Sequence, residues 1–261
     1  MTLVWRPGFQ FDTDASTYIE AVEAADTQAL ETNTRYAINN FVIGCKQDGI
    51  WTAIKASCIL AGARTLAGAL VPLAGTAPTN VGGLFVSGDY NRKTGLLGDG
   101  STKYLNSNRN NNADPQDSKH LSVYMSTHYT RDANRCAIGM GVGATGDSQL
   151  LSTTSTRLPR LNYATHPSIS DATALSGLEA TNRSNGSSID YLYNGVLTNY
   201  SSNSTTPTAG NILIFCRGSA GSPLTLANAR ISFYSIGESL NLTRLSARVT
   251  DLITAFGVAI P

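Results

Sequence analysis

Apolar residues recur at spacings of three, four and seven through the first sixty positions, which is the pattern of helices with one buried face. Asp12 or Asp14 can cap a first helix and Asp26 a second, because a carboxylate accepts hydrogen bonds from the first free backbone amides. The helical spacing continues over residues 50–59. We therefore predict three short helices in this part of the chain.

From residue 62 onward the pattern changes to alternation between apolar and polar positions, which is typical of strands. The clearest case is residues 120–128, where the apolar positions lie on one face and polar positions on the other, as in a half-buried antiparallel strand. Further strands are predicted at residues 65–73, 84–86, 136–142, 149–154, 157–163, 177–182, 188–193, 211–216 and 229–236.

Polar turn signals separate these strands, and Asn194-Gly195 is the kind of pair that forms tight hairpins. Short strands joined by such turns indicate a mainly β fold, an antiparallel jelly-roll β-sandwich. We place this sandwich at residues 62–240. An N-terminal arm and helical anchoring segment, residues 1–61, precedes it, and a C-terminal packing helix capped by Asn241 closes it within residues 241–261.

Composition and charge exclude several classes of function. Only 14% of the 261 residues are charged and the formal net charge is +1, so no global field recruits nucleic acid or an anionic membrane. The apolar stretch at residues 59–73 is interrupted by glycine, arginine and proline, and falls short of the ~18 to 20 apolar residues of a membrane helix. Residues 1–20 lack a secretory signal pattern, so we expect synthesis in a cytosol.

Cysteine and histidine residues give little support for a metal or cofactor. The four cysteines are scattered without a CxxC pair, which predicts buried free thiols. His120 and His128 lie on one predicted strand, roughly 26 Å apart at ~3.3 Å per residue, and cannot share a metal ion. We expect these histidines and His166 to be surface or hydrogen-bonded residues.

An Asn/Asp-rich run at residues 106–114, just before Pro115, is the densest uncharged hydrogen-bonding cluster and is predicted to be a surface loop. Amide side chains together with tyrosine rings suit glycan binding. The alternative, which the sequence favours, is a loop that hydrogen-bonds to its own backbone. The candidate ligand-binding residues are Asp99, Tyr104, Asn108, Asn110, Asn111, Asn112, Asp114 and Tyr124.

Motifs for catalysis are missing from the sequence. It contains no nucleophile elbow, zinc-protease motif or phosphate loop, and nothing in the pattern pairs two carboxylates. We therefore expect a protein that is not an enzyme. The open alternative is a polysaccharide-degrading enzyme, because His120, Tyr124 and His128 recur at intervals of four and can share one strand face.

The first eleven residues form an apolar, aromatic arm around a Pro7-Gly8 turn. Such an arm packs either on its own domain, which we favour, or on a neighbouring subunit. The candidate assembly contacts are Trp5, Phe9 and Phe11.

Three stretches of the chain carry a more specific signal. They are GCKQDGIWTAIKASCILAGARTLAGALVPLAGTAPT at 44–79, SGDYNRKTGLLGDGSTKYLNSNRNNNADPQDSKH at 87–120 and ARISFYSIGESL at 229–240. These blocks resemble phage and phage-derived virion proteins with a concanavalin A-like (laminin-G-like) jelly-roll domain. The resemblance implies a two-sheet jelly roll entered through a helical segment, in agreement with the pattern of strands and turns.

The resemblance also implies a place and a role. It suggests a structural protein of a tailed bacteriophage virion, made in the host cytoplasm, and we favour a tail-associated receptor- or glycan-binding protein. The alternatives are a capsid decoration (cement) protein, a polysaccharide-degrading enzyme on the same fold, and a bacterial surface lectin. The implied partners are other virion proteins, a host surface glycan, and further copies of the chain in a homo-oligomer such as a trimer.

Overall fold

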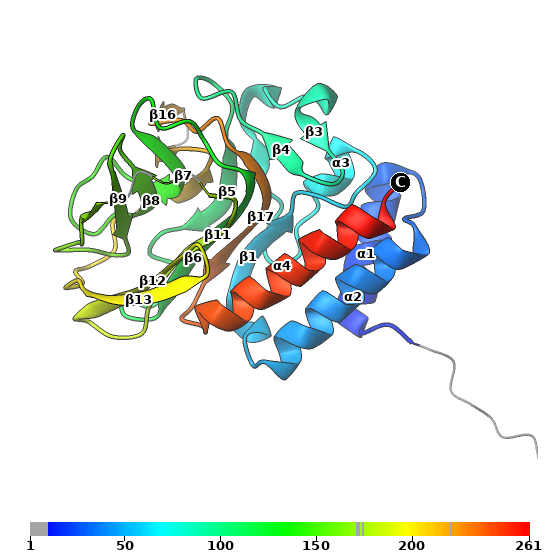
Figure 1. The fold of residues 1–261 in the computed structure, drawn as a ribbon, viewed down its shortest axis with the longest axis horizontal. Coiled ribbons are helices and arrows are strands. Elements are labelled where there is room, and N and C mark those ends of the chain that lie inside the picture. The colour runs from blue at the N-terminus through cyan, green and yellow to red at the C-terminus, as the bar shows by residue number, and fades with distance from the viewer. Residues whose placement is uncertain (1–9, 171–172, 174, 220) are drawn as a thin grey trace, which may run out of the picture.

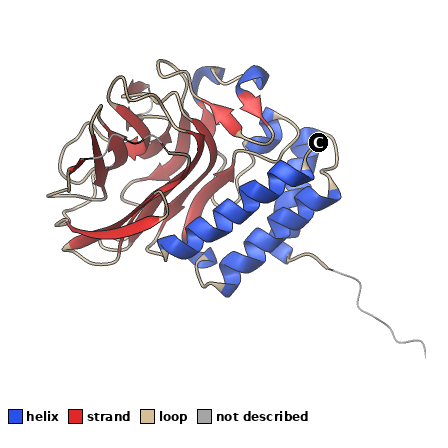
Figure 2. Cartoon of the chain, viewed as in Figure 1, coloured by secondary structure: helices blue, strands red, loops and turns tan. Residues whose placement is uncertain are grey.

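The computed structural model describes residues 10–170, 173, 175–219 and 221–261. The chain forms three layers: a group of helices, an antiparallel sheet packed against them, and a second antiparallel sheet on the far side (Figure 1). Helix and strand segregate along one axis of the molecule (Figure 2). The predicted mainly β sandwich with a helical start and a closing helix is confirmed.

The helical layer contains segments from both ends of the chain. Its members are α1 (Thr13–Asp26), α2 (Thr32–Gln47), the short α3 (Leu66–Ala69) and α4 (Leu242–Ala259), with 3-10 turns η1 (Trp51–Ala53), η2 (Val81–Gly83) and η3 (Ser87–Asp89). Asn241 caps α4 as predicted, since its side chain accepts from the Arg244 amide. None of the described helices combines the length and the apolar character of a membrane span.

The first sheet lies against the helices. Its strand order is β13 (Val196–Ser201), β12 (Ser188–Tyr193), β11 (Gly177–Arg183), β6 (Lys119–Thr127), β17 (Arg230–Gly237), β4 (Gly95–Leu97) and β3 (Tyr90–Asn91), and β1 (Ile54–Ile59) also pairs with β17. β1 precedes residue 62, so this sheet takes in residues before the predicted start of the sandwich. The division of the chain at residues 61 and 240 stays a prediction.

The second sheet has seven strands in the described part of the chain. Their order is β10 (Ile169–Ser170), β9 (Thr156–Arg160), β8 (Ser148–Ser152), β7 (Arg135–Met140), β14 (Asn211–Ile214), β5 (Leu105–Asn110) and β2 (Thr79–Asn80). A separate hairpin of β15 (Arg217–Ser219) and β16 (Ser222–Leu224) accompanies it. Both β10 and β13 are edge strands, and this places one open margin on each sheet.

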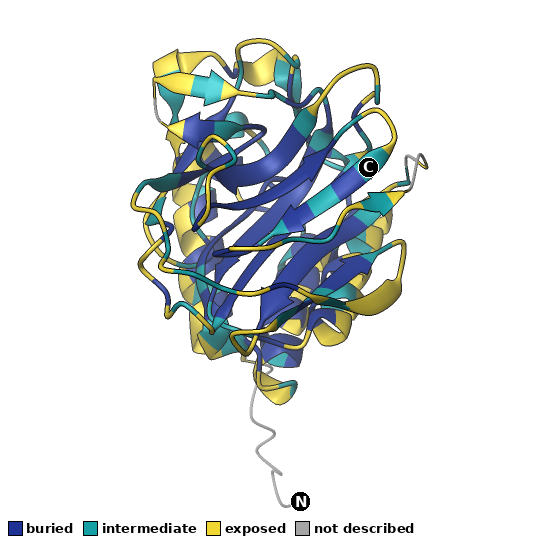
Figure 3. Ribbon diagram, turned by 90° about the vertical axis from the view of Figure 1, so that its left-hand side faces the viewer, coloured by how far each residue is buried: buried dark blue, intermediate teal, exposed yellow. Residues whose placement is uncertain are grey.

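Two hydrophobic cores hold the three layers together. One lies between the helices and the first sheet, where the Phe41 and Phe233 rings meet edge to face at 5.8 Å. The other lies between the sheets and includes Leu121, Val123 and Ile138. The central strands are therefore buried, while the hairpins and the outer helix surfaces are exposed (Figure 3). All four cysteines are buried free thiols, as predicted.

The prediction of a half-buried strand at residues 120–128 is right in position and wrong in burial. β6 covers it, but Ser122 on the polar face is as completely buried as Val123 on the apolar face. The reason is the helical layer, which covers the outer face of this sheet. Short serine side chains fit under it because they hydrogen-bond locally, as Ser122 does with the Ser235 carbonyl.

Four local predictions were wrong. Residues 50–59 form only the η1 turn before becoming strand β1, which is buried on both faces from Ala56 to Ile59. Residues 65–73 hold helix α3 instead of a strand, and residues 84–86 lie between two 3-10 turns. Residues 106–110 of the expected surface loop belong to β5, which pairs with β14 and β2. For residues 54–59 and 106–110 the deciding partner is distant in the sequence, because β1 pairs with β17 and β5 pairs with β14.

The predicted second cap was also wrong. Glu31, not Asp26, precedes α2. The Asp26 carboxylate instead accepts hydrogen bonds from the Arg64 amide, the Thr65 amide and the Thr65 hydroxyl, so it fixes the start of α3.

The N-terminal arm is only partly described. Trp5 and Phe9 lie outside the described residues. Phe11 packs edge to face on Tyr36 of α2, with ring centroids 5.5 Å apart. This contact is within the chain itself, and an assembly role for the arm stays a prediction.

Candidate ligand-binding site

A hollow of about 210 Å³ lies at the open margin of the sandwich, between β12 and β13 of the first sheet and β9 and β10 of the second. We call it the tyrosine pocket. Sites for drug-sized ligands usually measure roughly 300–1,000 Å³, so this one suits a ligand of about one ring. Its lining residues are Arg157, Ile169, Thr173, Tyr191, Tyr193, Asn194, Val196, Thr198 and Tyr200.

A tight hairpin creates one wall of the tyrosine pocket. Asn194 and Gly195 both adopt positive φ, 52° and 72°, as a two-residue turn of this kind requires. The turn sets Tyr193 opposite Val196 and Tyr191 opposite Thr198. Because alternate residues share a face of a strand, the side chains of both strands that point between the sheets gather on this wall.

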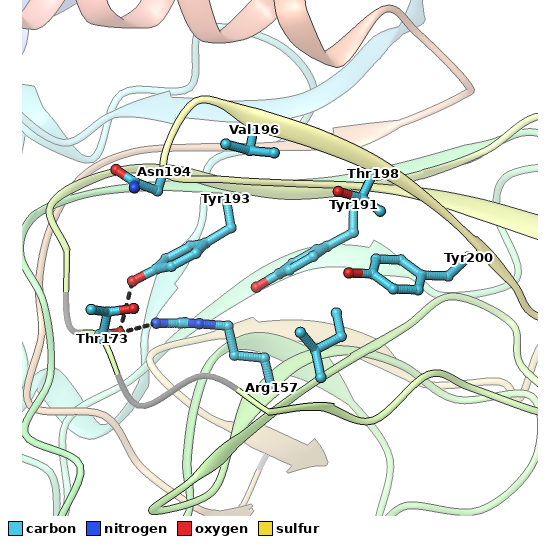
Figure 4. A pocket seen from close by; sticks show the side chains of 9 residues that line it. Arg157, Thr173, Tyr191, Tyr193, Asn194, Val196, Thr198 and Tyr200 are labelled. Carbon is cyan, nitrogen blue, oxygen red and sulfur yellow. Dashed lines mark hydrogen bonds between the residues drawn. The ribbon is translucent and has the colours of Figure 1, made fainter.

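Three tyrosine rings lie in a row along the wall, with Arg157 on the opposite side of the pocket (Figure 4). The Tyr191 and Tyr193 rings are nearly parallel, at 7°, with centroids 6.4 Å apart. The Arg157 guanidinium lies over the Tyr193 ring, 3.5 Å from its centroid. That face of Tyr193 is therefore occupied by the protein, and Tyr200 offers the more accessible ring.

A buried ion pair supports the floor of the pocket. Arg157 Nη1 lies 3.5 Å from Glu179 Oε2, and both side chains are almost fully buried. Tyr191 Oη donates a hydrogen bond of 2.7 Å to Glu179 Oε1. Burial opposes the charge on Arg157, but the Glu179 carboxylate and the neighbouring tyrosines together outweigh it, and the pKa of Arg157 is raised. Burial, followed by the Glu179 charge, raises the pKa of Tyr191.

Further hydrogen bonds fix the orientation of the floor. Tyr193 Oη donates to the Thr173 carbonyl at 2.9 Å, and Arg157 Nη2 donates to the same oxygen. Behind them, His128 Nε2 lies 3.4 Å from Arg157 Nη1. Burial lowers the pKa of His128, and the Arg157 charge contributes to the same shift. The imidazole is thus held neutral beside a permanent cation.

The remaining polar groups of the pocket face outward. Within the described residues, the side chains of Asn194, Thr198 and Tyr200 make no hydrogen bonds, while Asn194 and Thr198 are exposed. Together they provide an amide and two hydroxyls beside an aromatic surface. Such a set can hydrogen-bond to a neutral ligand with many hydroxyls and pack against its ring.

The sequence-predicted binding residues are not gathered at this pocket. Asp99 is exposed and caps its own turn, accepting from the amides of Ser101, Thr102 and Lys103. Desolvation opposes these bonds, but with the Thr102 hydroxyl they lower the pKa of Asp99. Tyr104 is buried, and its Oη accepts from the Gly221 amide.

The side chains of the Asn-rich segment, residues 106–114, mainly form hydrogen bonds and an ion pair within the protein. Asn108 donates to the Ala77 carbonyl, and Asn110 accepts from the Gly210 amide. Asn111 is fully buried, while Asn112 is exposed beside it. Asp114 is buried in an ion pair with Arg109. These contacts agree with the self-bonding alternative, and ligand binding at the segment stays a prediction.

Tyr124 and the histidines are also separated. Tyr124 lies on the helix-facing side of β6, and His120 is fully buried, with its nitrogens 2.7 Å from the Glu238 carbonyl and 2.6 Å from Ser235 Oγ. His128 reaches the floor of the tyrosine pocket. The three therefore do not share an open face, and the histidines are hydrogen-bonded as predicted. Among the described residues, no cluster of His, Cys, Asp or Glu is placed to hold a metal ion.

Sequence reasoning missed the residues of the tyrosine pocket. The strand at residues 188–193 and the Asn194-Gly195 turn were predicted, but the returning strand β13 was not. The available signal was the period of two that continues across the turn, with Tyr191 and Tyr193 before it and Thr198 and Tyr200 after it. Arg157 and Glu179 gave no local sign of their pairing.

Comparisons with known proteins give the fold. No protein-family model matches the chain, and no curated protein sequence matches it significantly. Several solved structures are similar to the chain. A mutant of HCR/D is similar with a TM-score of 0.50 and 10% identity, over 79% of this chain and 52% of that one. The binding domain of botulinum neurotoxin serotype D is similar with a TM-score of 0.49 and 10% identity, over 76% of this chain and 50% of that one.

A smaller neighbour is the CBM40 of the Ruminococcus gnavus IT-sialidase, with a TM-score of 0.38 and 14% identity, over 51% of this chain and 82% of that one. The chain spans about half the length of the HCR/D mutant and of the neurotoxin binding domain that it matches. At these identities the likeness extends to the β-sandwich fold, and the role of this chain must be argued from its own side chains.

Proposed function

We propose that the protein is a non-enzymatic glycan-binding protein whose ligand occupies the tyrosine pocket. The observation that carries this proposal is the set of Asn194, Thr198 and Tyr200 side chains, which make no hydrogen bonds within the described residues and lie beside a row of tyrosine rings. Sugars present alternating hydroxyls and apolar C–H faces, and this wall offers partners for both.

The charges around the pocket favour binding over hydrolysis. Most glycosidases need two carboxyl groups roughly 5–10 Å apart that both reach the substrate. Among the described lining residues there is no carboxylate. Glu179 lies behind them, almost fully buried and engaged by Arg157 and Tyr191.

We further propose that the protein works on the particle of a tailed phage, as a tail-associated receptor-binding protein. The support is the resemblance of residues 44–79, 87–120 and 229–240 to virion proteins of this fold. Capsid decoration is the competing role, because the same resemblance covers both kinds of protein. The two roles differ in what the purified protein binds.

A glycan array tests the pocket. The probes are printed bacterial capsular and lipopolysaccharide glycans, and the variants are Tyr200→Ala and Thr198→Ala. We expect saturable binding by the wild type, at least a tenfold loss of affinity in Tyr200→Ala, and a few-fold to tenfold loss in Thr198→Ala. Tyr36→Ala on α2 is the matched control and should bind normally. No bound glycan, or equal loss in the control, would contradict the proposal.

Sedimentation with cells and with undecorated phage heads tests whether the protein acts as a receptor-binding protein or as a capsid decoration protein. Binding to cells that is lost in Tyr200→Ala supports the receptor-binding role. Stoichiometric binding to heads that Tyr200→Ala leaves intact supports decoration and overturns the receptor-binding role. A purified polysaccharide that shortens during incubation would overturn the non-enzymatic assignment.

A further inference from the structure

Two arginines converge on the outer face of the seven-stranded sheet without an acidic partner. Arg160 ends β9 and Arg217 begins β15. A methyl group placed on Gly143 would lie 3.0 Å from Arg217 Nη1 and 3.4 Å from Arg160 Nη1, so both guanidinium groups reach the same small space. Within the described residues, neither forms an ion pair with a carboxylate.

Sheet register shows that this space is separate from the tyrosine pocket. Gln149 pairs with Arg160, and the neighbouring Leu150 faces the core between the sheets. Gln149 and Arg160 therefore face outward. Arg157, three residues earlier on β9, faces the opposite way and lines the pocket.

Gln149 joins the two arginines in one cluster. Its side chain is fully buried, and its Oε1 accepts a hydrogen bond of 3.1 Å from Arg217 Nη1. Three buried donors of this cluster have no hydrogen-bond partner in the described structure: Arg160 Nε, Arg217 Nε and Gln149 Nε2. Buried donors are nearly always satisfied in native proteins, so an acceptor is expected here.

The surrounding groups do not provide that acceptor. Asp147, the nearby carboxylate, accepts from the amides of Gly143 and Ala144, both at 2.9 Å. His166 Nε2 lies 3.1 Å from Arg160 Nη2, and the Tyr163 ring lies under the Arg160 guanidinium at 4.9 Å. These contacts orient Arg160 from one side and leave its Nε unsatisfied.

Electrostatics agree with this reading. Burial lowers the pKa of Arg160, and the charge of Arg217 lowers it further while Tyr163 opposes the shift. Two like charges in one partly buried space repel each other, and an anion between them would relieve both the repulsion and the missing hydrogen bonds.

We propose that Arg160, Arg217 and Gln149 form a binding site for one small oxyanion group, a sulfate, phosphate or carboxylate. Guanidinium groups suit these ligands because their planar N–H donors match pairs of anionic oxygens. The group can be a free inorganic ion or a substituent on an acidic polysaccharide. The inference stands whether or not the tyrosine pocket binds glycans.

Calorimetric titration with sodium sulfate at constant ionic strength, with sodium chloride as the balance, tests the site. We expect one saturable sulfate site on the wild-type protein and a rise of the melting temperature with sulfate. Arg160→Gln and Arg217→Gln should each lose at least tenfold in affinity. Arg244→Gln, which removes an exposed arginine of α4, is the charge-matched control and should bind as the wild type.

Two results would overturn the inference: no saturable sulfate binding beyond chloride, or an equal loss in Arg244→Gln. If a glutamine variant unfolds, Arg160→Lys and Arg217→Lys take its place. They keep the charge but lose the planar donor pair, so unchanged affinity in both would also count against the site.

A sulfated and an unsulfated oligosaccharide of the same backbone separate the two sources of the anion. A preference for the sulfated form that disappears in Arg217→Gln identifies a substituent on a polysaccharide. Binding of free sulfate without that preference identifies an inorganic ion. Tyr200→Ala should keep sulfate affinity, so failure of the glycan proposal and failure of this one are distinguishable.

Discussion

The Asn-rich segment and the β12–β13 hairpin are both polar regions built around tight turns, but they use their side chains differently. In the Asn-rich segment, the side chains of Asn108, Asn110 and Asn111 form hydrogen bonds with backbone groups 31 or more residues away. In the hairpin, the side chains of Thr198 and Tyr200 face a hollow and make no hydrogen bonds within the described part of the chain. A high density of polar residues therefore marks a structural junction in one place and the proposed binding surface in the other.

The difference follows from burial. Asn111 is fully buried, and a buried amide must find partners inside the protein. β13 is an edge strand with mostly exposed residues, where water already satisfies the polar groups and a ligand can replace that water. Mutations on the two sides of this comparison should therefore act on stability in one region and on binding in the other.

The largest effect is expected beneath the tyrosine pocket. Arg157→Met leaves the Glu179 carboxylate buried without its arginine, and should lower the free energy of unfolding by about 3–5 kcal/mol. Urea denaturation measures this. Adding Glu179→Gln removes the stranded charge and should recover most of the loss. A double variant as unstable as the single one would contradict a dominant role for the ion pair.

The second-largest effect on stability is expected at Asn111, the buried asparagine of the Asn-rich segment. Asn111→Ala removes the amide that donates to the Gly146 and Thr208 carbonyls and accepts from Lys119 Nζ, and should cost about 2–4 kcal/mol. The neighbouring, exposed Asn112→Ala is the control and should change stability by less than about 0.5 kcal/mol. If Asn111→Ala kept full stability and lost glycan binding, the Asn-rich segment would be a binding site and its structural role would be contradicted.

The pH dependence of stability should also come from the Asn-rich side. Burial lowers the pKa of Lys119 to about 7, and its Nζ donates to Asn111 and Asn162. Between pH 7 and the ordinary lysine pKa the unfolded chain holds a proton that the folded protein has released. The free energy of unfolding should then rise with pH, by up to about 1.4 kcal/mol per unit.

Urea denaturation at pH 7, 8 and 9 checks this slope. Lys119→Met removes the titrating group, so its slope should be smaller than that of the wild type by the lysine contribution. Identical slopes in the two proteins would show that Lys119 does not release its proton on folding. Glycan binding should not follow this slope, since Lys119 is not among the residues that line the tyrosine pocket.

The smallest effect is expected at the open wall of the pocket. Thr198→Val keeps the side-chain shape and removes one hydroxyl, so it should weaken glycan binding by about 0.5–1.5 kcal/mol, a few-fold to tenfold. Its melting temperature should match that of the wild type because Thr198 is exposed. Array binding and thermal unfolding measured together test both statements. Lost stability without lost affinity would make Thr198 a structural residue.

Local signals predicted much of the fold. The Asn241 cap, the apolar stripe of α4 and the Asn194-Gly195 turn all depend on residues close in sequence. β5 escaped prediction because its strand character comes from pairing with β14, about a hundred residues away. An asparagine-rich sequence has low strand propensity, and tertiary pairing overrode it.

The candidate site was less predictable than the fold. Period-two alternation can place Tyr191 and Tyr200 on one wall, but only the second sheet turns that wall into a pocket. Arg157 and Glu179 come from different sheets, and their charges gave no pattern along the chain. The Arg160 and Arg217 cluster depends on a hairpin folding over β8, which no local spacing records.

The position of β17 has a consequence for how the molecule is made. This strand comes late in the chain yet lies in the middle of its sheet, between β6 and β1. The Ser57 hydroxyl, for example, donates to the Tyr234 carbonyl across 177 residues. During synthesis, the sheet cannot close until residues 230–237 leave the ribosome, after α1, α2 and the earlier strands. Such long-range closure is slow, so we expect the nascent chain to expose strand edges that are prone to aggregation.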